Sequence, residues 1–124
     1  MRRSIMPSKF TNELGHIIIN EEVVAQISGM TAMECYGIVG MAARNVKDGI
    51  VQLLKGESLT KGIAVRLHEN KANIDFHIIV EYGTKISAVA DNLTSNVKYK
   101  VKDMLGIEVE SIKIFIEGVR VDKE

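Results

Sequence analysis

The sequence has few of the residues that define several large classes of protein. Its 124 residues contain one cysteine, one proline and no tryptophan, and its formal net charge is zero. The single cysteine, Cys35, excludes an intrachain disulfide and the metal-thiolate clusters that need several Cys or His ligands at short spacing. Zero net charge removes long-range attraction to nucleic acid or to an anionic membrane, so such binding would need a local patch.

Long apolar runs are also missing. No stretch reaches the about 20 consecutive apolar residues of a membrane helix, and no apolar run of signal-peptide length follows Arg2 and Arg3. The length fits one hydrophobic core. We therefore expect a soluble, cytoplasmic protein without membrane insertion, with a flexible N-terminal tail at residues 1–12 and a single domain at residues 13–124.

Hydrophobic spacing predicts most of the secondary structure. Three isoleucines at residues 17–19 precede Asn20, a favourable helix cap, which predicts a strand followed by a helix that ends near Cys35. Alternating apolar residues over 63–67 and 74–82 predict an antiparallel hairpin with one buried face, in which Arg66 lies opposite Asp75. A short helix is expected between residues 46 and 56.

The clearest pattern is a 3–4 spacing of apolar residues after Thr84, which predicts a long helix that ends at Gly106. A last strand alternates over residues 112–116, and the change of parity at Val119 predicts a bulge at Glu117–Gly118. The expected helix stripe consists of Ile86, Val89, Ala90, Leu93, Val97, Val101, Met104 and Leu105.

This order of elements favours an α+β fold. We expect a single two-layer domain whose helices pack on one face of a small mixed sheet. A ferredoxin-like βαββαβ order is the simplest layout that fits.

Side chains that carry enzyme chemistry are scattered along the sequence. Cys35, His16, His68 and His77 fall in different predicted elements, and no two histidines have the spacing of a helical metal site. We interpret Cys35 as a buried structural residue and place His68 and His77 on the outer face of the hairpin. We therefore expect no enzymatic activity, no catalytic residue, no metal and no cofactor.

Two features keep a small RNA-binding module open as the alternative function. Residues 37–40 match the bare Gly-x-x-Gly pattern of KH domains, although a tight turn between packed helices is the more ordinary interpretation. A basic stretch on the long helix contains Lys98, Tyr99, Lys100 and Lys102. Alternate residues of a helix point in different directions, so a solvated helix face is favoured and nucleic acid is not the expected partner.

Several stretches between about Gly15 and Val121 resemble the alkaline shock protein family of Gram-positive bacteria, and in particular its short, anchorless cytosolic branch. The similarity is strongest around residues 35–41 and 82–87. The other matching stretches are residues 47–49, 62–66, 74–86 and 109–119.

The resemblance implies a link to general or cell-envelope stress, alkaline stress included, and to lipid or cell-wall homeostasis. Because the sequence has a full apolar core but no active-site constellation, we expect the chain to act through self-association and contacts with a protein partner. The resemblance implies that this partner is membrane-associated or belongs to lipid metabolism. It supplies no catalytic residue.

Two surfaces are candidates for these contacts. One is the glycine-punctuated segment that contains Tyr36, Gly37 and Gly40. The other is an uncovered sheet face or strand edge near Lys113, Phe115 and Glu117.

Overall fold

The computed structural model describes residues 8–43, 53–54 and 56–121. A five-stranded sheet is built around the long strand β6 (Lys71–Glu81). Strand β7 (Glu108–Arg120) runs parallel to β6 along one side. Strands β5 (Ile63–His68) and β3 (Ile38–Ala42) pair antiparallel with β6 on its other side, and β4 (Leu53–Leu54) extends β3.

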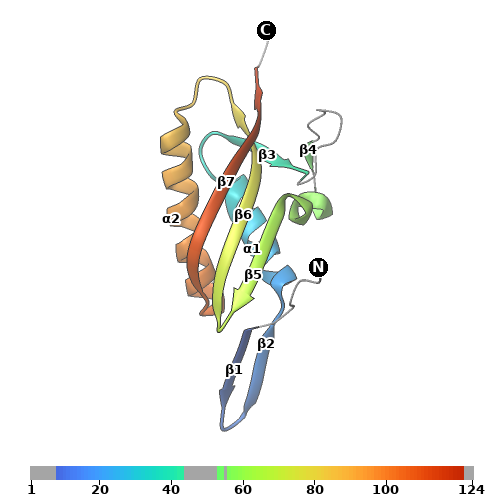
Figure 1. Ribbon diagram of the computed structural model, residues 1–124, viewed down its shortest axis with the longest axis vertical. Helices are drawn as coiled ribbons and strands as arrows, with labels where there is room; N and C mark the ends of the chain where they lie inside the picture. The colour runs from blue at the N-terminus through green and yellow to red at the C-terminus, as the bar shows by residue number, and fades with distance from the viewer. Residues whose placement is uncertain (1–7, 44–52, 55, 122–124) are drawn as a thin grey trace.

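The two α-helices among the described residues cover the same face of this sheet. Helix α1 (Glu21–Met33) packs against β3, β5 and α2, and α2 (Ile86–Leu105) packs against α1 and β7 (Figure 1). A 3-10 helix, η1 (Gly56–Gly62), contacts α1 and β3. The expected two-layer α+β arrangement, with helices on one face of a mixed sheet, is therefore confirmed.

The core lies between the helices and β6. Alternate residues of β6 point into it, and all five are at most 1% exposed: Ala72, Ile74, Phe76, Ile78 and Val80. The stripe of α2 meets them with four fully buried residues, Val89, Leu93, Val97 and Val101. Two expected members of the stripe are instead exposed, Ile86 by 44% and Met104 by 59%, because Ile86 begins the helix and Met104 borders a surface groove against α1.

The β5–β6 hairpin differs in register from the expectation. Its turn is only two residues long, Glu69 and Asn70, and both have the positive φ angles that such turns require. Arg66 consequently lies opposite Asn73, two residues from the expected Asp75. The ion pair with Asp75 still forms diagonally, with Nη1–Oδ2 and Nη2–Oδ1 distances of 3.1 and 3.3 Å.

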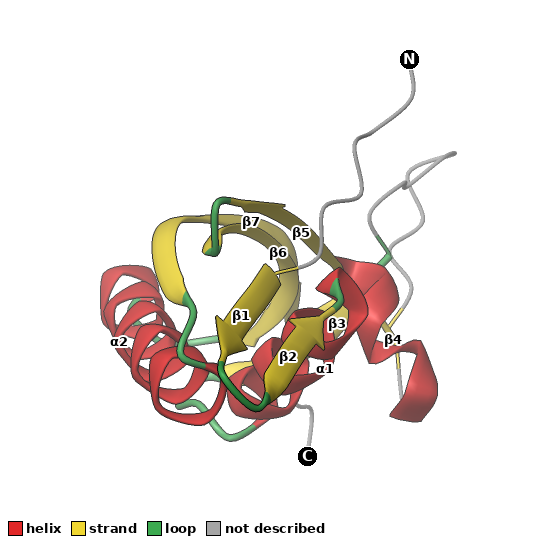
Figure 2. Cartoon of the chain, turned by 90° about the horizontal axis from the view of Figure 1, so that it is seen from below, coloured by secondary structure: helices red, strands yellow, loops and turns green. Residues whose placement is uncertain are grey.

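The expected N-terminal tail is too long. Residues 8–12 form strand β1 (Ser8–Asn12), which pairs with β2 (Gly15–Ile19) in a hairpin. The hairpin projects from the lower end of the domain in Figure 1 and therefore lies in front of the helices in the view from below (Figure 2). Asn70 anchors the hairpin, since its side-chain amide accepts from Lys9 N and donates to Lys9 O at 3.0 and 3.1 Å. Residues 1–7 lie outside the described part.

The expected βαββαβ order of elements is found in β2, α1, β5, β6, α2 and β7. The first of these strands, β2, nevertheless lies outside the five-stranded sheet. Strand β3, which the sequence did not reveal, occupies the place beside β6 instead. Of the short helix expected between residues 46 and 56, residues 46–52 and 55 lie outside the described residues. Leu53 and Leu54 form strand β4, so the helix prediction is wrong at these two residues.

Strand β7 contains the expected bulge. Ile78 of β6 pairs with Ile116 and Ile79 pairs with Gly118, so Glu117 is the extra residue. A second register shift, between Ala72 and Asn73, leaves Glu110 as an extra residue near the start of β7. Bulges bend a strand and re-aim its side chains.

We predict that Leu93→Ala lowers the free energy of unfolding by about 2–5 kcal/mol, because it leaves a cavity in a fully packed core. Met104→Ala on the same helix is the matched control and should change it by less than about 1 kcal/mol. Urea denaturation of both variants measures the difference. Equal effects would contradict the assignment of Leu93 to the core and of Met104 to the surface.

Candidate interaction surfaces

The outer face of the sheet is the face that neither α-helix covers. We use this name for the outward-pointing side chains of β5, β6 and β7. Its central feature is Phe115, whose ring stacks on the imidazole of His77 with centroids 4.6 Å apart and an interplanar angle of 9°. The two residues are opposite each other in the parallel β6–β7 pairing. Phe115 remains 43% exposed, so the stack presents an aromatic surface to solvent.

Glu117 contacts the same imidazole at a ring nitrogen. Its Oε2 lies 2.6 Å from His77 Nδ1, and both side chains are largely buried. Glu117 follows Phe115 by two residues, so the alternation of side chains along β7 places both on the outer face. Phe115, His77 and Glu117 therefore form one ordered cluster across two strands.

Polar groups surround this cluster. Asp75 bonds Arg66, and Asn73 bonds both Ser111 and Glu110. Lys113 stands opposite Asp75 in the register but forms no hydrogen bond or ion pair with any described residue. The outer face thus combines an aromatic centre, a rim of hydrogen-bonded polar groups and the charge of Lys113.

The Tyr36–Gly40 segment is arranged differently from the expectation. Gly37 has a φ of 79°, and a Cβ atom there would lie 2.7 Å from Val89 Cγ2. The segment joins α1 to strand β3, and Gly40 lies within that strand opposite Ile79. Both interpretations of the Gly-x-x-Gly pattern are therefore wrong. A KH loop and a turn between packed helices would each need a second helix at the place where β3 begins.

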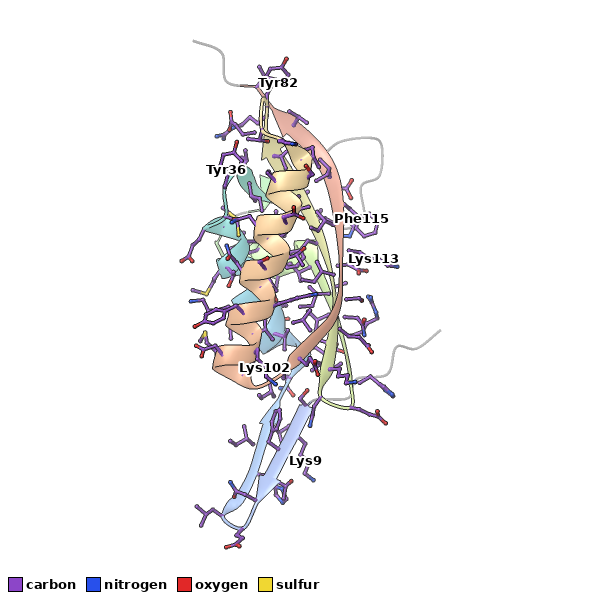
Figure 3. The ribbon with its side chains drawn as sticks, turned by 90° about the vertical axis from the view of Figure 1, so that its left-hand side faces the viewer. Lys9, Tyr36, Tyr82, Lys102, Lys113 and Phe115 are labelled. Carbon is purple, nitrogen blue, oxygen red and sulfur yellow. The ribbon has the colours of Figure 1, made fainter. Side chains whose placement is uncertain are left out.

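The six candidate residues do not form one surface. Tyr36 lies on the helix side of the domain, whereas Lys113 and Phe115 project from the outer face (Figure 3). Around Tyr36 the surface is hollowed by about 410 Å³, and the hollow reaches the sheet end at Glu81 and Arg120. Exposed Tyr82, just after β6, lies at the same end of the domain.

The basic stretch of α2 is split between two directions. Lys98, Tyr99 and Lys102 are exposed, but half-buried Lys100 turns toward α1. There it borders a groove of about 140 Å³, together with Glu34, Met30 and Met104. These lysines therefore do not form a single row along which the phosphate backbone of a nucleic acid could bind.

Cys35 is buried, as expected, between the two helices. Its Sγ donates to Thr31 O at 3.3 Å and accepts from Asn96 Nδ2 at 3.5 Å. His77 is on the outer face and His68 is exposed beside Glu69, also as expected, while His16 bonds Thr11 within the β1–β2 hairpin. Within the described residues, no three His, Cys, Asp or Glu side chains gather as metal ligands.

None of the described helices is long and apolar enough to cross a membrane.

Fold and surface together define a small two-layer α+β domain with an open sheet face. Two solved structures share this fold: a MamM CTD in a nickel form, 11% identical with a TM-score of 0.52, and a MamM CTD in a manganese form, 13% identical with a TM-score of 0.50. The first match covers 82% of this chain and 99% of that one, and the second covers 83% and 98%. At such low identity the likeness concerns the fold alone.

The chain belongs to the alkaline shock protein 23 family, described as having a cell envelope-related function, whose model matches residues 9–121. The resemblance found in the sequence is thereby confirmed. "Uncharacterized protein YloU" of Bacillus subtilis is 44% identical over 94% of this chain and 98% of its own length. "Uncharacterized protein Spy1614" of Streptococcus pyogenes is 30% identical over 94% of this chain and 97% of its own length.

We predict that Gly37→Ala destabilises the domain by about 2–4 kcal/mol, because alanine meets both a positive φ and the side chain of Val89. Gly83→Ala is the matched control. Gly83 also has a positive φ, of 93°, but a Cβ there would have no neighbour within 4 Å, so it should cost only about 1 kcal/mol. Thermal unfolding of both variants tests the packing of this turn, and equal losses would refute it.

Proposed function

We propose that this chain serves the cell envelope-related function of its family as a non-enzymatic protein that self-associates and binds a protein partner. The proposed site of action is the cytoplasm, under envelope or alkaline stress. The partner we expect is a protein associated with the membrane or with lipid metabolism, through which the chain contributes to lipid or cell-wall homeostasis.

One observation carries this proposal: the exposed aromatic ring of Phe115 held in place on the outer face. Binding surfaces of proteins typically centre on a few aromatic residues with a polar rim. Phe115 has this position, and its stacking on His77 fixes the ring before any partner arrives. A side chain that is already ordered loses less conformational entropy on binding.

The residues around Phe115 support the same proposal. Arg66 with Asp75, and Asn73 with Ser111, keep their polar groups satisfied within the sheet. A partner that covers these groups therefore leaves fewer buried polar atoms unpaired, each of which would cost about 1–3 kcal/mol.

We predict that Phe115→Asp weakens self-association and partner binding but leaves the domain folded. Because Phe115 lies outside the core, the loss of stability should be about 1 kcal/mol, the value of one aromatic stack. Light scattering coupled to size-exclusion chromatography reports association, and circular dichroism reports the fold. An unfolded variant would place Phe115 in the core and remove the proposal's main support.

Partner binding is tested directly by a photo-crosslinking amino acid placed at position 115 in the cells that normally make this protein. The matched control carries the same group at Tyr99, an exposed aromatic position on α2. We expect discrete adducts from position 115 only. Adducts of equal yield from both positions, or none from either, would contradict a binding role for the outer face.

A further inference from the structure

We propose that β7 pairs along its free edge with β7 of a second copy of this chain, antiparallel and centred on Phe115. This inference rests on the proposed self-association and gives it a contact surface. Strand β7 pairs with β6 on one side, and no other described strand lies along its second side (Figure 1). The backbone N–H and C=O groups of such an edge are a template for another strand.

Symmetry restricts how two identical edges can meet. A two-fold axis makes the strands antiparallel and gives both copies the same contact surface. We take the axis to be perpendicular to the sheet, so that one residue of β7 lies opposite the same residue of the second copy. Because side chains alternate along a strand, the outer faces of the two sheets then lie on the same side of the combined sheet. The remaining freedom is which residue of β7 lies on the axis.

Charge selects Phe115. With Phe115 on the axis, Lys113 of each copy lies opposite Glu117 of the other, which gives two contacts between opposite charges. An axis through Lys113 would place two lysines opposite each other, which is destabilising. An axis through Ile114 would place Phe115 opposite Lys113, and an axis through Ile116 would place Phe115 opposite Glu117. In neither register does Lys113 lie opposite Glu117.

The apolar side chains fit the same register. It places Ile114 of each copy opposite Ile116 of the other, and the two Phe115 rings meet at the axis. Ile116 is 37% exposed at the edge of the sheet, and Ile114 is half-buried. Pairing would therefore cover apolar surface that the single copy leaves in contact with water.

Lys113 and one carboxylate oxygen of Glu117 have no described partner of their own. Lys113 projects from β7 into solvent (Figure 3) and has no partner among the described residues. Glu117 bonds His77 through Oε2, and its second oxygen has no other described partner. Within one chain the two residues are four positions apart along a strand, about 13 Å, so they do not pair with each other.

The test uses the full chain and two charge reversals, Lys113→Glu and Glu117→Lys, in sedimentation velocity experiments. Each variant alone should associate at least about tenfold more weakly than the wild type, because both contacts become like-charge contacts. An equimolar mixture of the two variants should regain wild-type association, since both contacts of a mixed pair then join opposite charges. Lys102→Glu on α2 is the matched control and should leave association unchanged.

Each outcome has a distinct meaning once circular dichroism shows that the variants are folded. A wild type that stays monomeric at every concentration overturns the proposed self-association itself, together with this inference. A wild type that associates, while the variants behave like it or their mixture regains nothing, overturns the β7 pairing alone. Weakening by both single changes with recovery in the mixture supports the pairing centred on Phe115.

Discussion

The two-sided pairing of β6 is the constraint on which the rest of this structure depends. Its inward side chains are buried under α1 and α2, so its alternate side chains, among them His77, must face outward. Its parallel pairing with β7 requires a crossover connection, which α2 provides. The crossover helix packs beside α1, so neither of the described α-helices covers the outer face, and β7 pairs with no described strand other than β6. The aromatic centre and the free edge are thus two results of one topology.

Elements with strong periodicity could be predicted from the sequence. The apolar stripe around Leu93 located α2, and Gly106, whose φ is 72°, ends the helix as expected. The parity change at Val119 located the bulge in β7. Strand β3 could not be found in this way, because its Ile-Val-Gly-Met-Ala sequence shows no alternation. Strand β1 was missed because its residues are mostly polar, and the contacts that hold it are the pairing with β2 and the hydrogen bonds with Asn70, which is distant in sequence.

The candidate site was only partly predictable for a related reason. Phe115 and Glu117 were identified as surface residues, but their partner His77 depends on the exact register of the parallel β6–β7 pairing. Local periodicity does not encode that register. Similarly, the ion pair of Arg66 with Asp75 was predicted correctly, but from a register that is wrong by two residues. The register differs because the turn is short, with two non-glycine residues at positive φ. Local sequence signals located the elements, whereas long-range register determined the site.

If β7 pairs with a second copy around Phe115, the free edge of the sheet and the exposed aromatic ring belong to the same contact surface. Hydrogen exchange of the wild type at low and high protein concentration distinguishes a paired β7 edge from a free one. If β7 pairs with a second copy, amides of residues 111–117 become more protected as concentration rises, while exposed residues of α2 do not change. Protection that is independent of concentration, or that rises on α1 and α2 instead, would contradict this pairing.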